Sequence, residues 1–220
     1  MWITVLIYAP LCLCTLPLPH VTRYRFISQW TRFNLWCLER ICRVRFQVVG
    51  AEHLPKSPAI VVSNHQSAWE TLAFQVIFPP QSWVLKRELL FIPLFGWALA
   101  LTWPISIDRG ARRKALQQIL AGGMTRLDSG RWVVIFPEGT RRPPGALGRF
   151  GLGAALLAKH TRRPIVPVAH NAGRFWPKRG FVKHPGVITV VIGPPIPPGD
   201  APEALTEQVR HWIEQRSAEL

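Results

Sequence analysis

Apolar residues along the chain fall into short runs, and these runs alternate with segments of helical spacing. The runs predict strands at Val44–Val49, Ala59–Ser63, Ser82–Leu85, Ile105–Ile107, Trp132–Phe136, Ile165–Ala169 and Val187–Ile192. Several of them lack the alternation of a half-exposed strand, as expected where both faces of a sheet are covered. Pro167 disfavours a central place in the sheet for its strand, because proline cannot donate to the ladder.

Two segments between and after these runs have helical spacing. In "RRKALQQILAGGMTRLD", residues 112–128, the apolar positions are Leu116, Ile119, Leu120, Met124 and Leu127. After the start signals Asp200 and Pro202, the same spacing recurs at Leu205, Val209, Trp212 and Ile213. Strands that alternate with helices predict an α/β fold, with a mixed, largely parallel sheet of about seven strands flanked by helices.

The N-terminal region has a different pattern. Residues 1–22 carry no formal charge if His20 is neutral, and a continuous helix of this length would span about 33 Å. Pro10, Pro17 and Pro19 argue against one clean helix. No basic residue precedes the apolar run and no small-x-small site closes it, which argues against a signal peptide.

Residues 23–45 hold six arginines against one acid, Glu39. The pattern from Ser28 to about Arg43 predicts a helix with aromatic residues on one side and arginines on the other. This composition is typical of a helix at a lipid interface. Basic residues beside an apolar segment mark the cytoplasmic side of a bacterial-type membrane. We therefore expect residues 1–45 to form a membrane anchor, spanning or half-inserted, with a basic interfacial helix, and residues 46–220 to form a cytoplasmic domain at the inner membrane. A buried helix is the alternative for the anchor.

Composition narrows the possible partners. The chain is 48% hydrophobic and carries 27 Lys and Arg against 12 Asp and Glu, a net charge of +15. Such a balance indicates an anionic partner, which is nucleic acid, an acidic membrane surface or a phosphorylated substrate. All four cysteines lie within residues 12–42, so the globular part has no disulfide framework, and their spacing is not that of a zinc site.

The stretch "SNHQSAWET", residues 63–71, follows an apolar strand and has two compatible interpretations. Ser67 and Glu70 fit the S-x-x-E capping box at a helix start. His65 would also lie at the exit of a strand, where α/β sheets place their sites. A carboxylate one turn away would hold its imidazole in one tautomer, as a general base for a hydroxyl requires.

The stretch "IFPEGTRR", residues 135–142, ends another strand. Gly139 allows the backbone to approach a ligand closely, and Thr140, Arg141 and Arg142 offer a hydroxyl and two forked cations. This set predicts a phosphate pocket, and the alternative is a solvated turn.

Four blocks in the order found here resemble the glycerolipid acyltransferase family typified by 1-acylglycerol-3-phosphate acyltransferase. They are Asn64-His65…Glu70, Lys86-x-Glu88-Leu89…Pro93…Gly96…Ile107-Asp108-Arg109, Phe136-Pro-Glu-Gly-Thr-Arg141 and Val166-Pro167-Val168. "FPEGTR" is the most specific of them, and the blocks span roughly residues 64 to 171. The family's usual Asp is Glu70 here, which keeps the charge and adds a methylene.

The resemblance implies that residues 46–220 form an acyltransferase catalytic domain. Its reaction would transfer a fatty acyl chain from acyl-CoA or acyl-carrier protein to the free hydroxyl of a lysophospholipid. The acceptor it favours is 1-acyl-glycerol 3-phosphate, giving phosphatidic acid. By resemblance, His65 and Glu70 are catalytic, and the substrate is held by Asn64, Lys86, Arg109, Glu138, Gly139, Thr140 and Arg141. It implies no metal and no cofactor beyond the acyl donor as co-substrate, with membrane lipids as partners.

Other functions are weighed against this one. A nucleic-acid-binding module would explain the charge, but no RNP, helix-turn-helix or zinc-finger pattern is found, so no nucleic-acid partner is expected. A serine hydrolase is disfavoured because this chain lacks the G-x-S-x-G motif. The stretch "GLGAALLA", residues 151–158, is a weak signal for dinucleotide binding and is better explained by small residues that pack a helix on the sheet. A different lysolipid acceptor and an inactive lipid-binding member, suggested by Glu70, stay open.

Overall fold

The computed structural model of the protein describes residues 2–108, 110–178 and 180–220, so the predicted substrate residue Arg109 lies outside the described residues. The helices are α1 (Trp2–Leu13), α2 (His20–Cys42), α3 (Trp69–Ile77), α4 (Phe95–Ala100), α5 (Arg112–Asp128), α6 (Gly153–Thr161), α7 (Ala172–Phe175) and α8 (Pro202–Ala218), with short 3-10 helices η1 (Ala51–His53) and η2 (Arg87–Phe91). The strands are β1 (Val44–Val49), β2 (Ile60–Ser63), β3 (Gln81–Lys86), β4 (Ile105–Ile107), β5 (Trp132–Ile135), β6 (Ile165–His170) and β7 (Gly186–Ile192).

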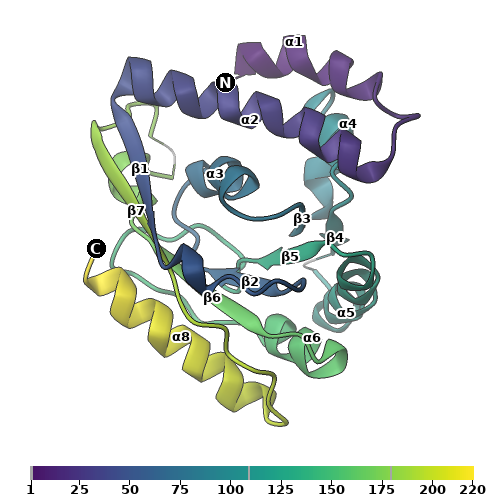
Figure 1. Ribbon diagram of the computed structural model, residues 1–220, viewed down its shortest axis with the longest axis vertical. Helices are drawn as coiled ribbons and strands as arrows, with labels where there is room; N and C mark the ends of the chain where they lie inside the picture. Colours follow the sequence, from purple (N-terminus) through teal and green to yellow (C-terminus); the bar gives the residue numbers. More distant parts are fainter. Residues whose placement is uncertain (1, 109, 179) are drawn as a thin grey trace.

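The strands form one seven-stranded sheet in the order β1-β7-β6-β2-β5-β3-β4 (Figure 1). Strands β6, β2, β5, β3 and β4 run parallel to one another. The pair β1 and β7 is also parallel, but β7 joins β6 in the antiparallel sense. The prediction of a mixed, largely parallel sheet is confirmed. Its carboxyl edge brings together the segments that follow β2, β5, β3 and β6, where a site is expected.

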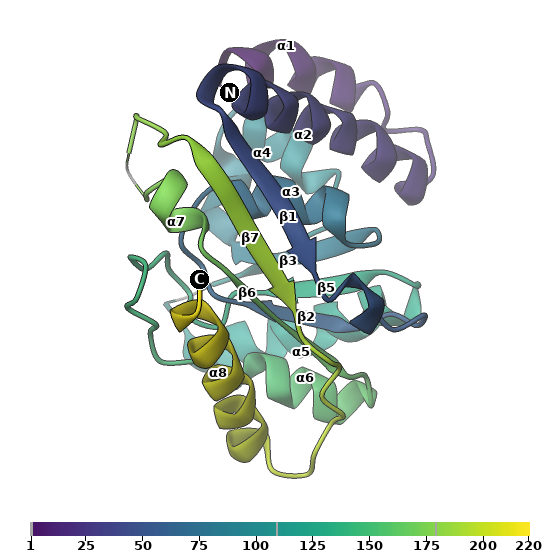
Figure 2. The same cartoon turned by 60° about the vertical axis from the view of Figure 1, so that its left-hand side comes forward.

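Two apolar cores cover the two faces of the sheet. Helices α2 and α3 lie on one face, and α5, α6 and α8 lie on the other (Figures 1 and 2). Trp69, Phe74 and Trp83 belong to the first core, while Leu157 and Ile213 belong to the second. Coverage on both sides explains why strands β2 and β5 are buried at every position and read as uninterrupted apolar runs.

Strand β6 corrects one expectation, because Pro167 lies in an interior strand between β7 and β2. The Ile165 N–H donates to Ile196 O, on the side of β6 that faces β7. Pro167 is two residues further along the strand, so its nitrogen faces the same side. There β7 has already ended at Ile192, and the chain continues as Gly193-Pro194. The missing N–H of Pro167 therefore removes no ladder bond, and the proline is tolerated.

The N-terminal region forms two antiparallel helices rather than one long apolar helix (Figure 1). Helix α1 ends at Leu13, and α2 begins directly after Pro19, eight residues before the predicted start at Ser28. Pro10 lies inside α1 and does not end it, whereas Pro19 fixes a backbone angle suitable for starting α2. Across the part of the chain that the structure describes, no helix combines the length and apolar character needed to cross a membrane. The division at residue 45 falls inside β1 and stays a prediction.

Candidate active site

His65 lies in the loop that leaves β2 and enters α3, at the carboxyl edge of the sheet. Its ring stacks on Phe136, which follows β5, with ring centroids 4.1 Å apart and planes 11° apart. Its Nδ1 lies 2.7 Å from Glu70 Oε1, and the histidine side chain is 15% exposed. A proton on Nδ1 leaves the lone pair on Nε2, so this ring is oriented to accept a proton from a hydroxyl.

Glu70 joins the cap of α3 to the histidine. Its Oε1 accepts hydrogen bonds from the backbone N–H groups of Gln66 at 2.9 Å and Ser67 at 2.7 Å, besides the His65 ring. Ser67 Oγ accepts from Trp69 N–H at 3.1 Å and not from the Glu70 amide, and Ala68 is the residue that precedes α3. The Glu70 half of the predicted capping box therefore forms, and the Ser67 half does not. The two sequence interpretations, a capped helix and a histidine with its carboxylate, are thus realised by the same side chains.

The electrostatics of Glu70 favour the charged carboxylate. Complete burial by itself raises the pKa of Glu70, but the electrostatic interactions with His170 and His65 and the hydrogen bonds from His65 and Ser67 outweigh it and set the pKa below its ordinary value. Glu70 therefore remains ionised, as stabilisation of a histidinium requires. The longer side chain of Glu, where the resembling family has Asp, reaches His65 without difficulty.

Glu138 holds the main chain of His65 rather than its ring. One carboxylate oxygen accepts from His65 N–H at 2.9 Å, and the other accepts from Gly148 N–H at 2.8 Å. Burial has the largest effect on Glu138 and raises its pKa. The hydrogen bonds from the two amides and the electrostatic interactions with His65 and Arg142 lower the pKa by less. Arg142 adds a further link, because its backbone N–H donates to His65 O at 2.7 Å. The loop after β5 therefore binds both the backbone N–H and the backbone C=O of His65.

Asn64 and His170 hold β2 and β6 together beneath the site. The Asn64 amide donates to His170 O at 2.8 Å and accepts from His170 N–H at 3.2 Å. The His170 ring accepts from Ala172 N–H through Nδ1 and so donates through Nε2 to Asn64 O at 3.0 Å. Asn64, predicted to bind substrate, is thus engaged in the scaffold, and its position behind His65 fixes that residue's backbone.

His170 is fully buried, and its hydrogen bonds to Asn64 and Ala172 give it a structural role beneath the site. Burial lowers its pKa below the ordinary value, although the Glu70 charge and the Asn64 hydrogen bond raise it. The sequence offered one signal, namely that His170 lies two positions after Val168 and ends the same strand.

The other predicted site residues are placed as follows. Gly139, Thr140 and Arg141 lie on the loop that follows β5, and Gly139 has a φ of 68°, a backbone conformation suited to glycine. Lys86 ends β3, where its ammonium pairs with Glu88 at 3.0 Å. Contacts among the described residues do not connect Lys86 to His65.

Lys178 was missed by the sequence analysis. Its Nζ lies 3.3 Å from Thr140 Oγ1 and 3.0 Å from Arg141 O, so it adds a cation to the predicted phosphate-binding turn. Its distance in the chain from "FPEGTRR" explains why no local pattern indicated it.

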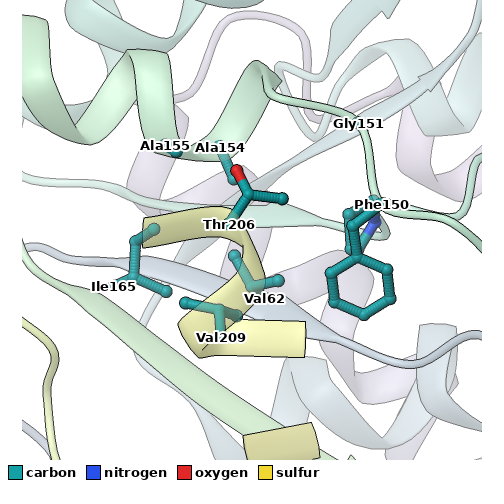
Figure 3. Close-up of a pocket in the computed structure, with 9 residues that line it drawn as sticks. Val62, Phe150, Gly151, Ala154, Ala155, Ile165, Thr206 and Val209 are labelled. Atoms are coloured by element: carbon teal, nitrogen blue, oxygen red, sulfur yellow. The ribbon is translucent and has the colours of Figure 1, made fainter. Parts of the chain in front are cut away.

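Two cavities flank this part of the sheet. One of about 100 Å³ is bounded by the histidine loop, the loop after β5 and the end of α8, and its lining includes Asn64, Glu138 and Arg142. The other, of about 10 Å³, is apolar and lies among Val62, Ala154, Ile165 and Val209 (Figure 3). That volume is about one water molecule, so the second cavity is a packing gap. In residues 2–108, 110–178 and 180–220, no three or more His, Cys, Asp or Glu side chains gather as a metal site would require.

Comparisons with known proteins agree with this geometry. The family model "Acyltransferase" matches residues 45–171. The 1-acyl-sn-glycerol-3-phosphate acyltransferase of Pseudomonas aeruginosa is 46% identical over 208 residues, which cover 92% of this chain and 81% of that protein. The alpha form of the enzyme with that name from Homo sapiens is 35% identical over 82% of this chain and 66% of its own length.

Among solved structures, the 1-acyl-sn-glycerophosphate (LPA) acyltransferase of Thermotoga maritima superposes with a TM-score of 0.78 and covers 97% of this chain and 88% of its own. At 24% identity this likeness bears on the fold. The match of the family model to more than half of the chain, together with the Pseudomonas relative, identifies the family: the chain belongs to the acyltransferases.

Proposed function

We propose that the protein transfers a fatty acyl chain from acyl-CoA or acyl-carrier protein to the free hydroxyl of 1-acyl-glycerol 3-phosphate, giving phosphatidic acid. The observation that carries this proposal is the 2.7 Å contact between His65 Nδ1 and the buried Glu70 carboxylate. It sits beside a basic loop in a chain whose relatives are 1-acyl-sn-glycerol-3-phosphate acyltransferases. The same contact argues against an inactive lipid-binding member, because Glu70 meets the histidine as a catalytic carboxylate must.

The chemistry needs one base and no enzyme nucleophile. His65 Nε2 takes the proton of the acceptor hydroxyl while its oxygen attacks the carbonyl carbon of the thioester, and Glu70 stabilises the histidinium that forms. When the tetrahedral intermediate collapses, the C–S bond breaks and His65 returns the proton to the leaving thiolate. A C–O ester bond replaces the thioester, so atoms and charge balance.

The phosphate of the acceptor needs cations beside this base. Arg141 and Lys178 meet at the turn after β5, and Lys178 contacts both Thr140 and Arg141. A guanidinium and an ammonium provide charge-assisted hydrogen bonds to phosphate oxygens. We assign the acceptor phosphate to this turn, with Arg109 as a further cation from the sequence pattern.

Membrane lipids are the source of such an acceptor, and we propose that α1 and α2 lie on the cytoplasmic face of the inner membrane. Ile3, Ile7 and Leu11 share one face of α1 and are 74%, 66% and 50% exposed. On α2, exposed Phe33 and Trp36 occur with exposed arginines, as in interfacial helices.

The experiment that tests the function compares acceptors and donors. The full chain is supplied with acyl-CoA or acyl-carrier protein and with 1-acyl-glycerol 3-phosphate, a lysophosphatidylcholine or a monoacylglycerol. We expect turnover of the phosphomonoester with at least one donor, and the donor comparison identifies the co-substrate. Preference for the monoacylglycerol, which has no phosphate, would contradict the proposal.

Replacement of Lys178 sharpens this test. A charge-assisted hydrogen bond is worth about 1.5–3 kcal/mol, so Lys178→Met is expected to raise KM for the phosphomonoester by about tenfold or more with little change in kcat. The matched control is Lys183→Met, because Lys183 lies on the same loop but bonds Phe181 O within it.

A further inference from the structure

A second cluster of cations lies at the opposite, amino edge of the sheet. Arg131 immediately precedes β5, Arg126 is in the last turn of α5, and Arg23 is in the first turns of α2. Arg131 and Arg23 are only 3% and 9% exposed. Neither the proposed reaction nor the acceptor turn uses this cluster.

Aromatic rings and one histidine hold the guanidinium groups close together. The Arg126 guanidinium lies 4.3 Å from the centroid of Trp103, and the Arg131 guanidinium lies 5.0 Å from that of Tyr24. On Trp103, the His20 ring stacks with a centroid distance of 4.7 Å, and His20 is a hydrogen-bond partner of Arg23. Burial lowers the pKa of Arg131, and the charges of Arg126 and Arg23 lower it further while Tyr24 raises it, so the three cations share one neighbourhood.

Part of the hydrogen-bonding capacity of the cluster is used by the chain. Arg126 donates to the carbonyls of Trp103 and Pro104, and Arg131 Nη1 donates to Thr102 O at 3.2 Å. The remaining guanidinium donors are buried yet find no partner in the described part of the chain: Arg131 Nε and Nη2 and Arg23 Nε. Buried donors of this kind are normally satisfied, and an unsatisfied one costs about 1–3 kcal/mol or more when charged.

Among the described residues, no carboxylate compensates the charge of the cluster. None of the ion pairs formed by the described residues includes Arg23, Arg126 or Arg131. The start of α2 adds its positive dipole end to the same place. Buried cations without a counter-charge are costly, so an anion with several acceptor oxygens would relieve both the charge and the orphaned donors.

The surroundings indicate where such an anion comes from. Leu16, Leu18 and Val21, in the turn between α1 and α2 and at the start of α2, are 58%, 43% and 44% exposed. They precede Arg23 by a few residues. If this apolar turn enters a bilayer, the cluster lies behind it at the depth of the lipid headgroups.

We propose that Arg23, Arg126 and Arg131 form a phosphate-binding site separate from the acceptor turn. Its ligand is the phosphate of an anionic phospholipid headgroup or free phosphate. In the first case the site anchors the α1–α2 pair to an acidic membrane, independently of the reaction at His65.

The first experiment measures thermal unfolding of the full chain in phosphate and in chloride at equal ionic strength and pH. Phosphate at a few times its dissociation constant is expected to raise the unfolding midpoint of the wild type by about 2–4 °C. The shift is lost in Arg131→Gln and in Arg23→Gln. Arg23 is the safer variant, since its guanidinium hydrogen-bonds the His20 ring and does not brace the turn at residues 102–104. The matched control is Arg32→Gln, an exposed arginine of the same helix, which keeps the shift.

A second variant separates this site from the acceptor turn. Arg141→Gln keeps the phosphate shift if the cluster binds the anion. Loss of the shift in Arg141→Gln but not in Arg23→Gln would place the phosphate at the acceptor turn and overturn this proposal while leaving the proposed function intact.

Vesicles identify the source of the phosphate. If it is a lipid headgroup, Arg23→Gln weakens binding to phosphatidylglycerol vesicles more than Arg32→Gln does, although both remove one charge, and neither changes binding to phosphatidylcholine vesicles. A thermal shift without this vesicle difference indicates free phosphate. Equal behaviour of Arg23→Gln, Arg131→Gln and Arg32→Gln in both experiments would mean that the arginines only brace the turn, and the proposal would be wrong.

Discussion

Glu70 on α3 and Glu138 in the loop after β5 both form hydrogen bonds with His65, yet their environments shift their pKa values in opposite directions. One oxygen of Glu70 accepts hydrogen bonds from the His65 ring and from two backbone amides. The pKa of Glu70 is lowered, although burial alone would raise it. Glu138 divides two backbone amides between its oxygens, and burial raises its pKa. The first carboxylate supplies charge to the imidazole, and the second supplies acceptors to the main chain.

The difference shows that proximity to a catalytic histidine does not by itself define a role. A charge that touches the ring changes the energy of the histidinium, and hence the transition state. A carboxylate that touches the backbone fixes where the ring stands. Glu138, for which substrate binding stays a prediction, fastens the loop after β5 to the main chain of His65 in this structure.

Changes at Glu70 are expected to have the larger effect. In Glu70→Gln the histidinium loses its counter-charge, so kcat should fall by about 10²–10³-fold, within the range of general acid–base contributions. Glu70→Asp keeps the charge but withdraws it by one methylene, and we expect a loss of about tenfold. Steady-state kinetics beside circular dichroism measure both. If Gln and Asp were equally damaging in a folded protein, the charge at Glu70 would not be what matters.

Glu138→Gln is expected to have a smaller effect on turnover, about tenfold or less, because the amide can still accept from one backbone N–H but not from both. Its pH dependence distinguishes it from Glu70. A raised folded pKa stabilises the protein below the ordinary value of 4.5, and this contribution is lost as pH rises through the folded pKa. The stability advantage of wild type over Glu138→Gln should therefore shrink as pH rises through this window.

For Glu70 the sign is reversed. Its folded pKa is lowered, so its contribution is present above the ordinary value of 4.5 and is lost as pH falls toward the folded pKa. The advantage of wild type over Glu70→Gln should grow as pH rises. Denaturant unfolding at several pH values measures both differences, and equal signs would contradict the contrast between the two carboxylates.

Much of the fold follows from short-range pattern. The helix at Arg112–Asp128 and the strand at Val44–Val49 have the predicted bounds, because apolar periodicity and burial agree there. The start of α2 was misplaced, since Pro19 caps it without a polar side chain. Pro167 is tolerated in an interior strand because β7 ends before it reaches this residue. That depends on the tertiary structure and not on the local sequence.

The site divides in the same way. His65 and Glu70 are five residues apart, so one turn of chain brings them together and the pattern could reveal them. His170 reaches Asn64 across 106 positions, and Lys178 reaches Thr140 across 38. Contacts of this separation are set by the strand order, and a single sequence does not disclose it.

The central claim is that His65 is the base for acyl transfer to a lysophospholipid hydroxyl. The most direct measurement follows a labelled acyl group from the donor to 1-acyl-glycerol 3-phosphate, with wild type beside His65→Ala at matched folding and vesicle binding. We predict labelled phosphatidic acid from the wild type and a rate lower by about 10³-fold or more in the variant. A His65→Ala protein as active as the wild type would contradict the account.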